Sequence, residues 1–119
     1  MQTKKQALIV VDVQNDFCPG GTLAVDHGDE VVAPLNKLIA IFLKRGAPVF
    51  KTRDWHPSTT RHFQKYGGTW PVHCVQNTNG AAFHPELHNV GQPSSIPRRP
   101  QRGRAKPSLL PSIRSYGIR

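Results

Sequence analysis

Cysteine is scarce in this 119-residue sequence, which contains only Cys18 and Cys74. Two cysteines are too few for the disulfide framework that stabilises many small secreted domains. Long hydrophobic runs are absent too, because no apolar stretch approaches the roughly 20 residues that a membrane-spanning helix needs. The first residues do not have the pattern of a secretory signal. We therefore expect an intracellular, cytoplasmic protein of one small domain with no membrane association.

Acidic residues are missing from the C-terminal part of the chain. Residues 1–87 carry nine Lys and Arg against seven Asp and Glu, whereas residues 88–119 carry seven Lys and Arg and no acid. The net charge of +9 therefore arises mainly in the C-terminal segment. Proline is also denser there, with five residues in 88–119 against six in 1–87. We predict a domain over residues 1–87 and a basic Pro-, Ser- and Arg-rich tail over residues 88–119, whose composition favours disorder.

The N-terminal part has the pattern of a strand, a helix and a second strand. Residues 7–11, ALIVV, are continuously apolar, which predicts a strand buried on both faces, as in a parallel sheet. Apolar residues from 31 to 43 recur at spacings of three and four, which predicts an amphipathic helix with its regular start near Pro34 and its end before Gly46. Residues 47–54 predict the second strand. This order indicates an α/β fold in which the two strands are parallel.

Carboxylates end both predicted strands, and histidines follow the second one. Because the carboxyl ends of parallel strands share one edge of the sheet, Asp12 and Asp54 should meet there. Asp54 and His56 point to one side of an extended segment, and His62 and His73 follow. One carboxylate with two or three imidazoles suits a divalent metal, zinc first, with iron or manganese as alternatives. The alternatives are that the histidines lie on the surface of a polar loop and that Asp12 caps a turn.

Aromatic residues and the two cysteines allow both structural and functional readings. Phe17 and Trp70 could belong to the core, or they could stack on a flat aromatic ligand. Cys18 and Cys74 could be nucleophiles, but free cysteines more often pack as small apolar residues, and neither has an activating partner at a diagnostic spacing.

Three long motifs resemble a known family. The segments ALIVVDVQNDFCPGGTLAV, TRDWHP and TWPVHCVQNTNGAAFHPEL resemble the N-terminal half of nicotinamidases, within the isochorismatase-like superfamily of cysteine hydrolases. The resemblance covers about residues 6–87. It implies a three-layer α/β/α fold with a mainly parallel sheet, truncated here, and hydrolysis of nicotinamide to nicotinate and ammonia in NAD salvage. It also implies that full-length members of the family can form homo-oligomers.

The resemblance also implies roles for individual residues. Asp54, His56 and His73 match metal ligands, and His62 lies where some members supply a further ligand. The metal would orient the substrate through its ring nitrogen.

Other parts of the implied catalytic machinery are only partly present. Asp12 matches the aspartate that exchanges protons with a cysteine nucleophile, and Phe17 and Trp70 match aromatic residues that pack on the pyridine ring. The chain has no counterpart of the nucleophile, because Cys74 is at a different place in the motif. Lys106 lies in no matching context for the catalytic lysine. We therefore expect an inactive nicotinamidase chain, with a non-catalytic metal- or ligand-binding fragment as the alternative.

The tail over residues 88–119 has three interpretations. A basic arm for nucleic acid is disfavoured, because no aromatic platform is interleaved with the charges. A frameshift or retained intron would put unrelated sequence in place of the strand at whose end the family has its catalytic lysine. A genuine short isoform would bind metal or substrate without turnover.

Overall fold

Two parallel strands form the sheet of the described chain. The structure is a computed structural model that describes residues 4–90, so the prediction of disorder for the tail falls, from residue 91 onward, outside the described residues. Strand β1, Leu8–Val11, pairs with strand β2, Val49–Thr52. Their parallel register places Leu8 beside Val49 and Val11 beside Thr52.

Helix α1, Val32–Lys44, makes the crossover between the strands. It follows a 3-10 turn, η2, Gly28–Val31, and Pro34 lies in its first turn, where the missing N–H needs no partner within the helix. The helix ends at Lys44, and Gly46 follows it with a φ of 67°, a conformation that suits glycine. There, Ala47 N–H donates to the carbonyl oxygen of Phe42 and Gly46 N–H to that of Leu43, which forms a Schellman motif.

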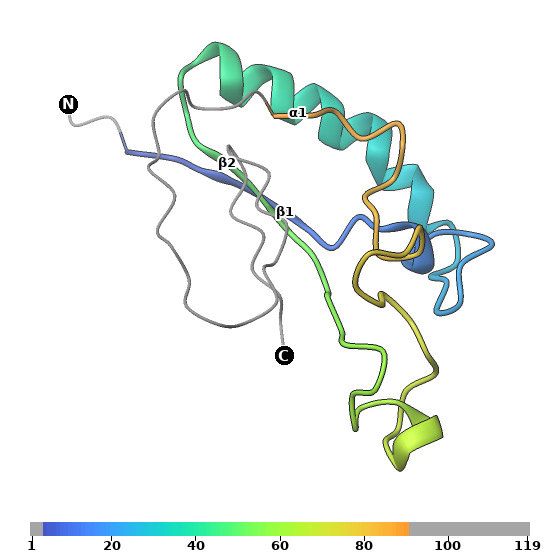
Figure 1. Ribbon diagram of the computed structural model, residues 1–119. Coiled ribbons are helices and arrows are strands. Elements are labelled where there is room, and N and C mark those ends of the chain that lie inside the picture. The colour runs from blue at the N-terminus through green and yellow to red at the C-terminus, as the bar shows by residue number, and fades with distance from the viewer. Residues whose placement is uncertain (1–3, 91–119) are drawn as a thin grey trace.

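The core lies between α1 and one face of the sheet (Figure 1). Its buried apolar residues come from both strands, from the helix and from the segment that returns alongside the helix. They are Val10, Val13, Val32, Ile39, Val49, Leu87 and Val90. Burial of this set supplies most of the favourable free energy of folding in this part of the chain.

The second face of the sheet is open in the described part of the chain, which differs from the prediction that β1 is buried on both faces. Ile9 and Val11 are 60% and 58% exposed, because only one face of the sheet has a helix packed on it here (Figure 1). The predicted helical stripe is also narrower than expected. Val31, Leu38 and Leu43 are exposed by 41–45%, because the face that packs on the sheet is centred on Val32 and Ile39.

Long loops beyond the carboxyl ends of the strands make up the rest of the described chain. They contain two 3-10 turns, η1, Asn15–Phe17, and η3, Gln64–Tyr66. Among residues 4–90, no helix is long and apolar enough to cross a membrane.

The open face of the sheet predicts concentration-dependent self-association of the 119-residue chain, because exposed apolar strand residues favour contact with another chain. The double variant Ile9→Thr/Val11→Thr keeps β-branched side chains and should shift the chain toward monomer in sedimentation velocity. Val25→Thr removes a side chain of similar exposure, 57%, from a loop and should have no effect. Equal association of all three proteins would contradict the prediction.

Candidate metal and ligand site

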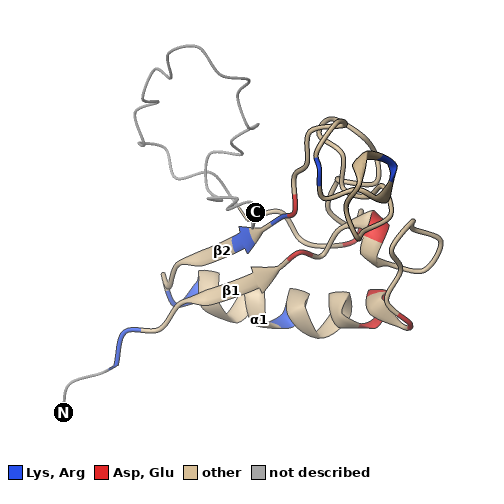
Figure 2. Cartoon of the chain, turned by 90° about the horizontal axis from the view of Figure 1, so that it is seen from below, with Lys and Arg blue, Asp and Glu red and all other residues tan. Residues whose placement is uncertain are grey.

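The aspartates that follow β1 and β2 lie at the same end of the sheet, and acidic segments follow both strands there (Figure 2). The parallel ladder continues one residue past β1, since the N–H of Asp12 donates to the carbonyl oxygen of Thr52 at 3.1 Å. Asp12 has a φ of 51°, an uncommon left-handed conformation for a residue with a side chain. This turn takes the chain out of the sheet, and both Asp12 and Asp54 line one cavity.

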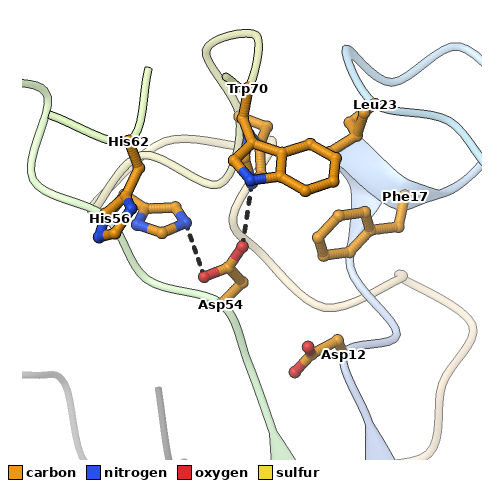
Figure 3. A pocket seen from close by; sticks show the side chains of 8 residues that line it. Asp12, Phe17, Leu23, Asp54, His56, His62 and Trp70 are labelled. Atoms are coloured by element: carbon orange, nitrogen blue, oxygen red, sulfur yellow. Dashed lines mark hydrogen bonds and ion pairs between the residues drawn. The ribbon is translucent and has the colours of Figure 1, made fainter. Parts of the chain in front are cut away.

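Asp54, His56 and His73 form a compact group of potential metal ligands, with one ligand atom from each within 4.8 Å of the others. Oδ1 of Asp54 is 2.8 Å from Nε2 of His56, and Oδ2 of Asp54 is 3.0 Å from Nε2 of His73. The three side chains are only 5–13% exposed. The carboxylate therefore faces two imidazoles in a place that is largely shielded from water, and Figure 3 shows the one of His56 beside Asp54.

Backbone hydrogen bonds bring the two ligand-bearing segments together. The N–H of His56 donates to the carbonyl oxygen of Cys74 at 2.9 Å, and the N–H of Gln76 donates to the carbonyl oxygen of His56 at 2.8 Å. His56 and Val75 thereby form an isolated parallel bridge. This short pairing fixes His56 beside the segment that carries His73.

The hydrogen bond between His73 and Pro71 determines which ring nitrogen of His73 is free to bind a cation. Nδ1 of His73 lies 2.6 Å from the carbonyl oxygen of Pro71, and a carbonyl can only accept, so Nδ1 carries a proton. A neutral His73 then directs the lone pair of Nε2 toward Oδ2 of Asp54, 3.0 Å away. Two lone pairs at this distance repel unless a second proton or a cation lies near them. The donor set and this orientation fit a divalent metal such as zinc.

The cavity beside this group has a volume of about 320 Å³. Its lining combines the acidic and imidazole side chains with two aromatic rings and one leucine. The lining residues are Asp12, Phe17, Leu23, Asp54, His56, His62, Trp70 and His73. Figure 3 shows Asp12 and Phe17 on one side of this space and His56 and His62 on the other.

His62 and the two aromatic residues of the lining lie near the metal-ligand group. The His62 and His56 rings are 5.9 Å apart between centroids, and His62 lies outside the group of three ligands. The rings of Phe17 and Trp70 lie 5.9 and 6.4 Å from that of His73. Trp70 is 53% exposed, so part of its ring is available to a ligand.

Asp12 has an environment that favours its protonated form. Burial raises the pKa of this carboxyl group, the hydrogen bond that Thr52 Oγ1 donates to Oδ1 at 2.8 Å opposes the rise, and the charge of Asp54 adds to it. A carboxyl group with a raised pKa at the wall of a cavity is suited to accept and return a proton.

Neither cysteine is an exposed, activated thiol. Cys74 is 0% exposed, and burial, followed by the charges of Asp54, Asp16 and Asp12, raises the pKa of its thiol to about 12. Cys18 is 6% exposed, and burial together with the charge of Asp29 raises the pKa of its thiol. Reactive cysteines need the opposite environment, one that is accessible and favours the thiolate.

Two buried polar residues of the first motif were not singled out from the sequence. Gln14 is 0% and Asp16 8% exposed. Asp16 Oδ2 accepts the N–H of Cys74 at 2.8 Å, next to His73, and a side chain on Gly80 would collide with this carboxylate. The signal in the sequence is a cluster of polar residues, QND, that begins three residues after the end of an apolar strand.

The family described as Isochorismatase domain matches residues 6–118. This chain belongs to the isochorismatase family. The match confirms the predicted family. The predicted α/β fold class is confirmed by the similarity to solved structures of this family.

Three relatives illustrate the similarity. The chain is 43% identical over 98 residues to the nicotinamidase of Escherichia coli strain K12, covering 70% of this chain and 46% of the relative. It is 51% identical to the pyrazinamidase of Pyrococcus horikoshii, solved in complex with zinc, with a TM-score of 0.65 over 67% of this chain and 45% of that one. It is 39% identical to PnC1 from L. infantum, solved in complex with nicotinate, with a TM-score of 0.65 over 71% and 42% of the two chains. This isochorismatase-family chain thus spans about half the length of the relatives that it matches.

The raised pKa of Asp12 predicts a pH-dependent effect on stability. The folded state holds more protons than the unfolded state between the ordinary pKa of 3.8 and the raised one, so the contribution of Asp12 to stability falls as the pH rises through this window and stays low above it. Asp12→Asn should therefore raise the Tm of the metal-free chain at neutral pH and make it less dependent on pH across the window.

The matched control is Asp26→Asn, whose side chain is 98% exposed and whose replacement should leave the Tm unchanged. Thermal unfolding followed by circular dichroism between pH 3.5 and 7.5 measures both variants. A lower Tm for Asp12→Asn at pH 7.5 would show that the ionised carboxylate stabilises the fold.

Proposed function

We propose that this chain carries the metal- and pyridine-binding half of a nicotinamidase-type amidohydrolase, which converts nicotinamide to nicotinate and ammonia. The observation that carries the proposal is the group of Asp54, His56 and His73 beside two aromatic rings and a third carboxylate in one cavity of about 320 Å³. A small, flat, polar ring fits such a lining. The nicotinamidase relative and the nicotinate-bound relative support this class of substrate.

The proposed roles follow from the positions of the side chains. Asp54, His56 and His73 would hold a divalent metal, zinc first and iron or manganese otherwise, with His62 near enough to the cavity to contribute. When bound, such an ion supplies a Lewis-acidic point of attachment for a ring nitrogen.

The remaining lining residues would bind the ring and handle a proton. Phe17 and Trp70 would cover the faces of the pyridine ring and exclude water from it. Asp12 would accept the proton of a nucleophile, since its carboxyl group lies in the cavity wall and its pKa is raised.

We further propose that the 119-residue chain does not turn over nicotinamide by itself. Its two cysteines are buried, and the pKa of each thiol is raised, so neither is a suitable nucleophile. The burial of both cysteines also favours the second candidate function, a non-catalytic fragment or isoform that binds metal and ligand. In either case we propose an intracellular place in NAD salvage, and homo-oligomers for the full-length protein.

Ammonia release tests the proposed lack of turnover. We expect none above background when the purified chain is incubated with nicotinamide and zinc or iron, while E. coli nicotinamidase in the same assay gives a signal. Asp12→Ala and Cys74→Ala are run in parallel. Activity that disappears in Cys74→Ala would identify Cys74 as a nucleophile and overturn this part of the proposal.

Binding tests the proposed site independently of turnover. Nicotinamide should bind the zinc-loaded chain in isothermal titration calorimetry, and His73→Ala should weaken binding about tenfold or more, because it removes a ligand of the metal. The control His27→Ala removes a histidine that is 73% exposed, lies outside the cavity and should leave binding unchanged. Equal binding by His73→Ala and the wild-type chain would contradict the site.

A further inference from the structure

Gln14 is a fully buried amide whose hydrogen bonds are directed at the main chain of Asp54. Its side-chain Nε2 donates to the carbonyl oxygen of Asp54 at 2.8 Å, and its Oε1 accepts the N–H of Asp54 at 2.7 Å. Nε2 also donates to the carbonyl oxygen of Ala81 at 2.9 Å. Both amide protons and the amide oxygen are therefore used, which is what a residue that is 0% exposed requires.

These bonds replace the ladder that ends with β2 at Thr52. Beyond this point Asp54 has no strand beside it in the described chain, and the Gln14 side chain pairs with its N–H and carbonyl oxygen as a neighbouring strand would. Pairing of both main-chain groups restricts the backbone torsions of Asp54 and so fixes the direction of its Cα–Cβ bond.

Gln14 is itself held in place from the main chain. Its N–H donates to the carbonyl oxygen of Asp12 at 2.9 Å, and its own carbonyl oxygen accepts the N–H of Phe17 at 3.1 Å. An antiparallel bridge also links Gln14 to Phe83. The amide thus extends from a fixed backbone across to Asp54 and Ala81, and it ties three separate segments together.

We propose that Gln14 is a positioning residue for the metal site, which presets the Asp54 carboxylate so that its two oxygens face Nε2 of His56 and of His73. This inference rests on the proposed metal site and extends it to a residue that touches neither metal nor substrate. A ligand whose direction is fixed in advance loses little conformational entropy on binding, and loss of such an outer partner typically costs about 10- to 100-fold in metal affinity.

The test compares Gln14→Met with Gln64→Met. Methionine has nearly the shape of glutamine and removes all three bonds of Gln14. Gln64 is the matched control, because its Nε2 donates to the carbonyl oxygen of Thr69 at 3.0 Å at an exposed position and Gln64 belongs neither to the metal-ligand group nor to the lining of the cavity. Zn²⁺ affinity is measured on the 119-residue chains by competition with a chromophoric chelator, with His73→Ala as the variant that lacks a ligand.

We expect Gln14→Met to bind Zn²⁺ about 10- to 100-fold more weakly than the wild type, and Gln64→Met to bind within about twofold. Amide hydrogen exchange of the metal-free chains provides a second readout. The N–H of Asp54 should exchange faster in Gln14→Met, while the amides between β1 and β2 keep their protection. If Gln14→Met is unfolded in buffer, all chains are compared in sucrose, which favours the compact state.

The outcomes separate the two proposals. Wild-type affinity in Gln14→Met, with weakened binding in His73→Ala, would overturn the role of Gln14 and leave the metal site standing. Absence of Zn²⁺ binding by the wild type, or equal binding by His73→Ala, would overturn the metal site and the role of Gln14 with it.

Discussion

The parallel pairing of β1 with β2 is the constraint on which the rest of this chain depends. Parallel strands cannot be joined by a tight turn, so helix α1 must cross over between them, and its apolar face then forms the core with Val10 and Val49. The same pairing sends both strands toward one edge of the sheet. Asp12 and Asp54 leave the sheet side by side at this edge, and the cavity forms where the loops that follow them meet.

Beyond that edge, side chains take over the role of main-chain pairing. The amide of Gln14 fixes the segment of Asp54, and the carboxylate of Asp16 fixes the segment of Cys74, next to His73. These buried groups are satisfied by backbone partners, so their loss would leave unpaired polar groups in the interior. A loop-rich region with little regular secondary structure can thus hold one ligand atom from each of three side chains within 4.8 Å of one another.

The periodicity of the sequence predicted the elements with small errors. The predicted helix near Pro34 and the two strands are present, because local apolar spacing and the stop at Gly46 are strong signals. Burial was predicted less well. Ile9 lies in an apolar run but is exposed, because periodicity gives no information about which faces of a sheet are covered. Lys51 is 1% exposed, and its ammonium lies 4.9 Å from the Phe83 ring centroid. The alternation of apolar and polar residues in the sequence does not predict a buried lysine.

The sequence predicted the candidate metal ligands, but it did not predict the buried polar residues that hold their segments in place. Asp54 and His56 stand out because they end a strand, and His73 because the motif around it resembles a family. The parts played by Gln14 and Asp16 depend on contacts across 40 and 58 residues of chain, and no local spacing encodes such contacts. Cys74, whose N–H donates to Asp16, has a φ of 46°, an uncommon conformation for a residue with a side chain.

The burial of Cys74 gives the chain an internal probe of its own motions. A thiol that is 0% exposed and paired through its backbone to Asp16 and His56 cannot meet an alkylating reagent while the loops are closed. Its labelling rate therefore reports how often the His73 segment separates from the rest of the site. Ligands that tie this segment to Asp54 would slow the labelling, so one native sulfur atom can report the opening of the loop without an added dye.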